Sequence, residues 1–210
     1  MTTHTMIERP YPGLRPFSRE ESYLFFGREE HTDQLLEKLG ESRFISVVGL
    51  SGNGKSALVR AGMIAALESG YLVSAGAHWR IVEMRPGNDP LRNLAEALTK
   101  VFEPAQGVHA QGMFPFWQAS LRRGPRGLLE ILRENPLPPN TNLLLMVDQF
   151  EELFRYHGEG GRDETEAFVN LLLTTAQQTE VPVYVVITMR SDYIGDCAVF
   201  HTAGGARGPL

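Results

Sequence analysis

Residues 49–56 read GLSGNGKS and match the spacing G-x-x-x-x-G-K-[ST] at every fixed position. Glycines allow such a loop to curl until its backbone N–H groups converge on a phosphate, and the following helix presents its positive N-terminal end to the same anion. Lys55 is expected to reach the β- and γ-phosphates and Ser56 to bind Mg²⁺. The segment, called the phosphate loop below, therefore predicts a nucleotide site with contacts from Gly49, Ser51, Gly52, Asn53, Gly54, Lys55, Ser56 and Ala57.

A second candidate is Asp148, which directly follows the apolar run 143–147. The carboxyl end of a strand in an open α/β sheet faces the ligand crevice, so Asp148 is expected to hold Mg²⁺ together with Ser56. Glu151 and Glu152 follow at positions suited to polarising an attacking water, and Glu151 is the first choice as base. The alternative is that Asp148 only caps a buried strand and both glutamates open a helix, where the dipole favours acidic residues.

Arg190 closes another apolar run, residues 183–189. If this strand lies between the strands that precede the phosphate loop and Asp148, Arg190 points at the γ-phosphate, where it can stabilise or sense that charge. The alternative is an exposed arginine paired with Asp192. The residues predicted to take part in catalysis are Lys55, Glu151, Glu152 and Arg190.

Short apolar strands alternate with amphipathic helices along the chain, which predicts an α/β fold with a mostly parallel sheet covered on both faces. This is the three-layer architecture of a P-loop NTPase core, with four recognisable strands. Strands are expected at 44–48, 79–84, 143–147 and 181–188, and helices at 29–39, 55–69, 91–102, 116–122, 128–134 and 164–177. Residues 104–115 are expected to form a loop because they contain glycine and proline.

The composition limits the possible functions. The 210 residues are 42% hydrophobic and 21% charged, as in a globular domain, and carry 20 basic against 25 acidic side chains. The net charge of −5 disfavours nucleic-acid binding, and the arginines at 122, 123, 126 and 133 are read as a solvated helix face. The only cysteine, Cys197, is expected to be structural, and the histidines show no metal spacing. Without a secretory signal or an apolar run of ~20 residues, we predict a cytoplasmic protein and no membrane partner.

Several segments together resemble the signal-transduction P-loop ATPases with numerous domains (STAND), and more narrowly their bacterial branch, the novel STAND NTPase 1 family. The resemblance covers about residues 10–198 and implies an ATP- and Mg²⁺-dependent switch that hydrolyses ATP slowly. It also implies effector and sensor partners, self-association in the ATP state, Gly27 and Arg28 near the adenine, and Arg190 as γ-phosphate sensor. The matching segments are 10–17 (PYPGLRPF), 24–29 (LFFGRE), 49–62, 84–87 (MRPG), 147–154 (VDQFEELF) and 190–193 (RSDY).

The sequence departs from the family at its C-terminal end. The family's core has a fifth strand beyond the phosphate-loop strand, followed by a lid of helical and winged-helix domains, and Ala198–Leu210 reads as neither. We therefore expect an extended segment at 1–20, a truncated P-loop NTPase core at 21–198 and a loose tail at 199–210. Such a chain is either a fragment or a shortened gene product, or its remaining domains are on another chain. Loss of the lid would weaken nucleotide binding and switching.

Three functions follow from these patterns. The first is an ATP-binding switch module with weak ATPase activity, and the second is a non-hydrolysing remnant or scaffold that docks partners. The third, an ATP-driven nucleic-acid motor, is disfavoured by the acidic charge. Adenine is favoured over guanine because the chain lacks a guanine-reading Asn-Lys-x-Asp motif.

Overall fold

The computed structural model describes residues 25–71, 78–102, 110–155 and 162–199. The predicted extended segment 1–20 and residues 200–210 of the predicted tail lie outside this part of the chain.

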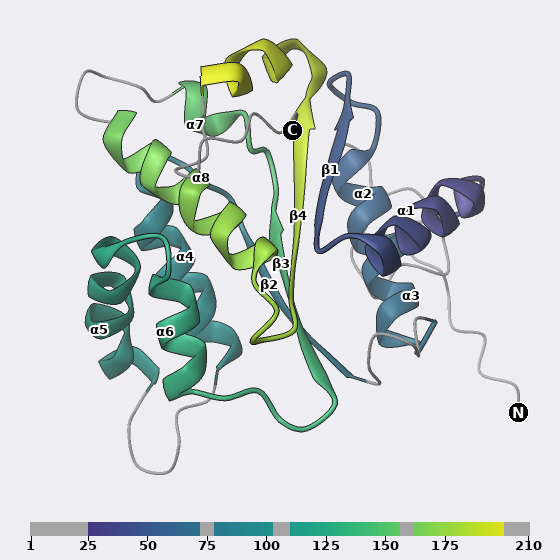
Figure 1. Cartoon of the computed structure of the whole chain (residues 1–210). Helices are drawn as coiled ribbons and strands as arrows, with labels where there is room; N and C mark the ends of the chain where they lie inside the picture. Colours follow the sequence, from purple (N-terminus) through teal and green to yellow (C-terminus); the bar gives the residue numbers. More distant parts are fainter. Residues whose placement is uncertain (1–24, 72–77, 103–109, 156–161, 200–210) are drawn as a thin grey trace, which may run out of the picture.

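A sheet of four parallel strands forms the centre of the molecule (Figure 1). Its order is β1-β4-β3-β2, so β4 lies between β1 and β3 and meets the condition set for Arg190. The register pairs Gly49 with Arg190 and Val147 with Ile187, which brings the carboxyl ends of these three strands to one edge of the sheet. The strands are β1 (Phe44–Gly49), β2 (His78–Met84), β3 (Thr141–Val147) and β4 (Val183–Arg190).

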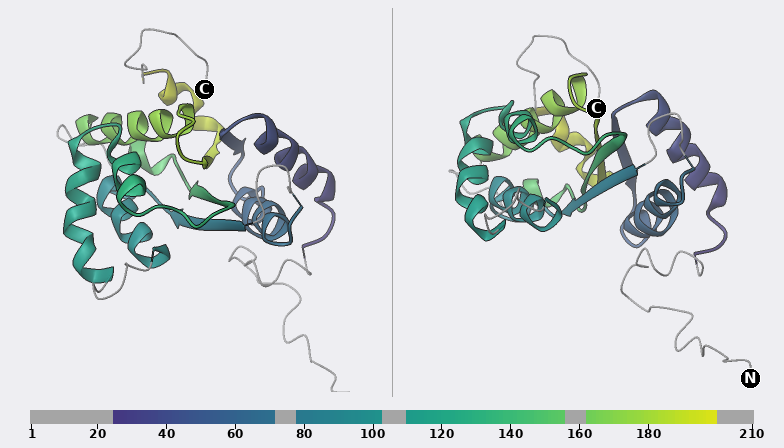
Figure 2. Two further views of the ribbon diagram at one scale, coloured as in Figure 1. Left: turned by 60° about the horizontal axis from the view of Figure 1, so that its bottom comes forward. Right: turned by 90° about the horizontal axis from the view of Figure 1, so that it is seen from below.

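Helices cover both faces of the sheet, as expected (Figures 1 and 2). One face carries α1 (Glu29–Glu41) and a continuous helical stretch composed of α2 (Lys55–Ala57), the π-helical η2 (Leu58–Ile64) and α3 (Ala65–Glu68). The other face carries α4 (Pro90–Val101), α5 (Ala110–Arg123), α6 (Gly127–Glu134) and α8 (Arg162–Gln177). Two short elements, α7 (Glu152–Arg155) and the 3-10 helix η4 (Ser191–Val199), follow β3 and β4 at the carboxyl edge.

The alternation of side chains along the strands divides the core in two. Leu144 and Met146 of β3 pack with α1 and η2, whereas Leu143, Leu145 and Val147 pack with the helices of the opposite face. Every residue of β3 is buried, as a central parallel strand requires. The predicted three-layer α/β fold is therefore confirmed.

Some predicted boundaries differ from the structure: β4 covers Val183–Arg190 rather than 181–188, and the largest difference is at α5. Helix α5 begins at Ala110 and contains Pro115, so residues 110–115 are helical rather than part of a loop. Proline inside a helix costs about 3 kcal/mol, but the segment gains apolar burial in exchange. Trp117 is 2% exposed and packs edge-on against Phe102, and Met113 and Phe114 also contact the core.

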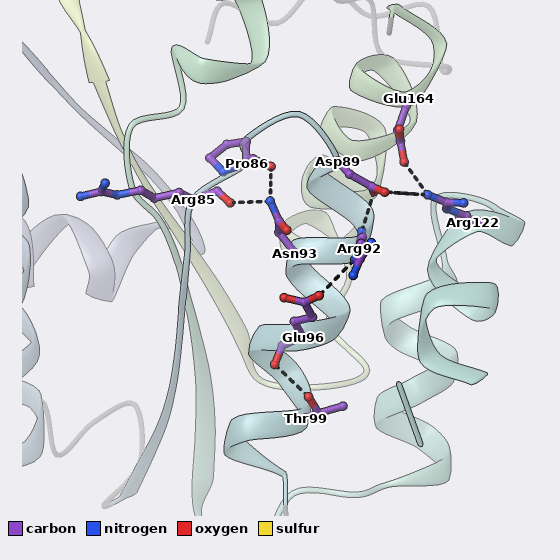
Figure 3. A network of polar contacts seen from close by, with 9 residues as sticks. All are labelled: Arg85, Pro86, Asp89, Arg92, Asn93, Glu96, Thr99, Arg122 and Glu164. Carbon is purple, nitrogen blue, oxygen red and sulfur yellow. Dashed lines mark hydrogen bonds and ion pairs between the residues drawn. The ribbon is translucent and has the colours of Figure 1, made fainter. Parts of the chain in front are cut away.

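The helices on this face are joined by a polar network at the start of α4 (Figure 3). Asp89 caps α4 by accepting a hydrogen bond from the backbone N–H of Arg92 at 3.0 Å. Arg122 of α5 binds both Asp89, at 3.1 Å, and Glu164 of α8, at 3.2 Å. Burial and the nearby Asp89 carboxylate raise the pKa of Glu164 despite this arginine.

Gly127 provides a test of how closely α5 and α6 approach each other. A Cβ atom at this position would lie 2.2 Å from the carbonyl oxygen of Ser120 and 2.8 Å from the Cα of Leu121. We expect Gly127→Ala to destabilise the fold by about 1–3 kcal/mol because backbone atoms have to move. Thermal unfolding measures the change. Gly40→Ala is the control: its Cβ meets nothing within 4 Å, so it should be neutral or stabilising, and equal melting of both variants would contradict the packing described here.

Candidate functional site

The phosphate loop connects β1 to the helix α2. Gly52 and Gly54 have φ values of +80° and +70°, a left-handed backbone that glycine adopts without strain, and residues 50–54 are exposed. The loop therefore presents a curled backbone to solvent at the carboxyl edge of the sheet, immediately before a helix N-terminus, as the motif predicted.

Lys55 folds back over this loop. Its Nζ donates hydrogen bonds to the carbonyl oxygens of Gly49 at 2.9 Å and Leu50 at 2.8 Å. From the other side, the Arg28 guanidinium donates to the carbonyl of Asn53 at 3.4 Å, and the neighbouring Gly27 has a φ of +79°. The segment containing Gly27 and Arg28 thus lies against the phosphate loop, although the two regions are far apart in the sequence.

Asp148 is the centre of the polar contacts at the end of β3 and is fully buried. Its Oδ1 accepts hydrogen bonds from the Ser56 hydroxyl at 2.5 Å and the Thr188 hydroxyl at 2.6 Å. Its Oδ2 accepts from Nη2 of Arg60 at 3.0 Å, and Nε of Arg85 lies 3.6 Å from the same oxygen. The predicted pair Ser56 and Asp148 is therefore in direct contact.

These contacts keep the buried carboxyl group ionised. Burial raises the pKa of Asp148, but hydrogen bonds from Ser56 and Thr188 and the charge of Arg60 together lower it below the usual value of 3.8. An ionised carboxylate beside a hydroxyl is a donor set of hard oxygens, which Mg²⁺ prefers. Ser56 and Asp148 are therefore chemically suited to holding the metal that the motif implies.

The backbone turns sharply after Asp148 and separates the two glutamates. Gln149 has a φ of +58°, and its N–H donates to the Thr188 hydroxyl at 3.0 Å. Glu151 is 6% exposed and accepts a hydrogen bond from the backbone N–H of Arg190, at the β4 side. Glu152 instead accepts one from the backbone N–H of Gly87 at 3.0 Å, in the loop that follows β2.

Arg190 ends β4 directly beside Gly49, the first residue of the phosphate loop. Its side chain is paired with Asp192, with Nε 3.0 Å from Oδ1, and its guanidinium lies 5.5 Å from the centre of the Tyr193 ring. The backbone of Arg190 therefore lies beside the phosphate loop, as the γ-phosphate hypothesis requires. Its side chain, however, is paired with Asp192, as the alternative interpretation described.

Sequence reasoning missed Thr188, Arg60, Glu83 and Arg85. Thr188 is a polar residue in an otherwise apolar stretch of β4, two positions before Arg190, and that contrast is a usable signal. Arg60 lies four residues after Ser56 within a buried apolar helix, which is a second signal. Arg85 lies in the segment 84–87 that resembles the family, but no role was predicted for it, and Glu83 carries no signal because its role follows only from the position of β2 beside β3.

Other predicted features are located as follows. The arginines of the basic cluster form ion pairs: Arg122 with Asp89 and Glu164, Arg123 with Glu130, and Arg126 and Arg133 with Glu180. Cys197 is buried, with its Sγ 3.6 Å from the sulfur of Met189. Among the described residues, no group of three or more His, Cys, Asp or Glu side chains is clustered as a metal site, and no helix combines the length and apolarity needed to cross a bilayer.

The parallel order β1-β4-β3-β2, with a glycine-rich loop after β1 and a buried aspartate after β3, defines the class of P-loop NTPases. Within that class, the chain belongs to the Novel STAND NTPase 1 family, whose model matches residues 10–206. No curated protein matches it significantly.

Two solved structures match most of this chain. The ORC2 protein of Aeropyrum pernix, solved in ADPNP and ADP complexes, is 12% identical with a TM-score of 0.54, over 90% of this chain and 47% of that one. The Walker-type ATPase PABY2304 of Pyrococcus abyssi is 19% identical with a TM-score of 0.46, over 87% of this chain and 49% of that one. This chain thus spans about half the length of each.

Thr188 tests how strongly the Asp148 network depends on β4. Thr188→Val keeps the shape but removes a donor from the buried carboxylate and an acceptor from the Gln149 N–H. We expect a loss of about 1–3 kcal/mol in the free energy of unfolding, measured with urea. The control is Thr175→Val, because the buried Thr175 hydroxyl has no hydrogen-bond partner within the described residues. That variant should be neutral or stabilising, and an unchanged Thr188→Val protein would contradict the network.

Proposed function

We propose that this chain binds ATP with Mg²⁺ at the phosphate loop, hydrolyses it slowly and acts as a nucleotide-dependent switch module. The observation that carries the proposal is the 2.5 Å contact between Ser56 and the buried, ionised Asp148. This contact places the Ser56 hydroxyl of the phosphate loop directly beside the Asp148 carboxylate at the end of β3. Membership of a STAND-type NTPase family supports the same function.

Binding is assigned to the loop and to the residues that flank it. Backbone N–H groups of the loop and the N-terminus of the following helix attract the phosphates. Lys55 exchanges its bonds to the Gly49 and Leu50 carbonyls for phosphate oxygens. Ser56 and Asp148 hold Mg²⁺, which when bound neutralises charge on the β- and γ-phosphates. Gly27 and Arg28 are assigned to the adenine by the family resemblance, and the contact of Arg28 with the Asn53 carbonyl supports a position beside the loop.

Glu151 is the better candidate for the residue that activates water. The phosphate loop follows β1, and β4 is the neighbour of β1. Glu151 accepts a hydrogen bond from the end of β4. Glu152 accepts one from the loop after β2, the strand at the opposite end of the described sheet from β1. Glu151 is therefore nearer to where a γ-phosphate would lie, and Glu152 positions the β2–α4 loop.

Arg190 provides the switching element of the proposal. Its backbone adjoins the phosphate loop, while its guanidinium is bound to Asp192 in a short ion pair at the surface. A γ-phosphate offers that guanidinium a more highly charged partner, so ATP and ADP favour different arrangements of residues 190–193. Effector and sensor partners, ATP-dependent self-association and a cytoplasmic location stay predictions from the family resemblance and the composition.

Nucleotide binding is tested by thermal unfolding with Mg²⁺ and ATP, ADP or GTP. A ligand at a hundred times its dissociation constant adds about 2.7 kcal/mol of stability, which raises the melting temperature of a domain of this size by roughly 5–10 °C. We expect that rise with adenine nucleotides in the wild type and none in Lys55→Ala. Lys38→Ala, at the last turn of α1 and away from the loop, is the matched control and should behave as wild type. No rise in the wild type, with a cooperative transition, would favour a scaffold that has lost its ligand.

Hydrolysis is tested by single-turnover assays of two neighbouring variants. Glu151→Gln should bind ATP normally and hydrolyse it about 10²–10⁴-fold more slowly, since a positioned base contributes that much. Glu152→Gln should retain most of the rate. The opposite ranking would transfer the role of the base to Glu152, and two unchanged rates would remove it from both residues.

A further inference from the structure

We propose that Arg60 is a positioning residue for the metal site: it holds Oδ2 of Asp148 so that Oδ1 faces the phosphate loop, and Glu83 holds Arg60 in turn. The proposal deepens the proposed function and rests on it, since it concerns how the same site binds Mg²⁺-nucleotide.

The two oxygens of Asp148 have different surroundings. Oδ1 is bound by the hydroxyls of Ser56 and Thr188, and Ser56 is the residue that the motif assigns to the metal. Oδ2 is bound by a guanidinium at 3.0 Å. A cation repels Mg²⁺, so the side of the carboxylate that carries Arg60 is closed to the metal, and the side that carries Ser56 is the one that can receive it.

Arg60 is suited to this task because its planar guanidinium binds two acids in fixed directions. Its Nε donates to Glu83 of β2 at 2.8 Å while its Nη2 donates to Asp148, which directly follows β3. The side chain is 17% exposed, and both ion pairs raise the pKa of its guanidinium against the effect of burial. A single arginine of η2 thereby spans two neighbouring strands and fixes the rotation of the carboxylate between them.

Packing alone does not hold Arg60 in this orientation. Arg60, Glu83 and Arg85 line a polar cavity of about 330 Å³ together with residues of α4. Arg85 is half exposed and 3.6 Å from Oδ2, so it does not replace Arg60 at hydrogen-bond distance. The contact with Glu83 is therefore what directs Arg60 toward Asp148, in the way that groups behind a metal ligand commonly set its orientation.

The test compares nucleotide affinity with and without metal. The dissociation constant of a fluorescent ADP analogue is measured in EDTA and in saturating Mg²⁺, and the value in EDTA divided by the value in Mg²⁺ reports the contribution of the metal. We expect Arg60→Gln to reduce this ratio about 10–100-fold while the value in EDTA stays unchanged. Glu83→Gln should reduce it in the same direction but less, and Arg60→Lys, which keeps the charge but not the two-directional donors, should be intermediate.

Arg92→Gln is the matched control, since Arg92 forms an exposed pair with Glu96 one turn along α4. Equal weakening with and without Mg²⁺ would overturn the proposal and leave Arg60 a structural residue. A larger ratio would also overturn it, because Arg60 would then compete with the metal. If Arg60→Gln does not fold, Glu83→Gln decides between these outcomes. Absence of binding in the wild type, or unaltered binding in Lys55→Ala, would instead remove the proposed function itself.

Discussion

The charge of one buried carboxylate organises this end of the molecule. Asp148 is inaccessible to water, and an isolated ionised carboxylate in such a place costs several kcal/mol. Three side chains from two elements compensate this cost: the helical stretch that opens at the phosphate loop supplies Ser56 and Arg60, and β4 supplies Thr188. The burial of Asp148 and the close approach of these elements therefore depend on each other. If any one of these elements loses its donor side chain, the buried Asp148 carboxylate is left without enough hydrogen-bond partners.

The same constraint separates the roles of the residues that follow. Because Asp148 and Phe150 bond to the backbones of Met84 and Thr188, on opposite neighbours of β3, the chain has to turn between them. The left-handed conformation of Gln149 makes that turn, at some cost for a residue other than glycine. Beyond it, Glu151 contacts the β4 side and Glu152 the β2 side. Two adjacent acids of equal chemistry thus acquire different surroundings from the backbone alone.

The sequence was sufficient for the layers, the phosphate loop and Asp148, because these depend on local periodicity and on a motif with fixed spacing. It was insufficient for features that depend on which strands are neighbours. Arg190 could be placed only on condition that β4 lay beside β1, and its pairing with Asp192 competed with a second interpretation. Arg60 and Glu83 are separated in the chain and meet only because β2 lies beside β3, on the side of the sheet that η2 covers. Pro115 misled the helix prediction because apolar burial outweighed its local preference.

The strand order also has a consequence for how the molecule is assembled. Within the described residues, β1 pairs with β4 alone, although β1 ends at Gly49 and β4 begins at Val183. Both contacts of β4, with β1 and with β3, therefore form only after residues 183–190 have been synthesised, and closing so long a segment is slow. Until then β2 and β3 can pair, but Asp148 lacks Thr188, and β1 has an unpaired edge on each side. A nascent chain that stops before β4 carries the phosphate loop without the strand that joins it to Asp148, so the site is complete only once β4 has paired with both neighbours.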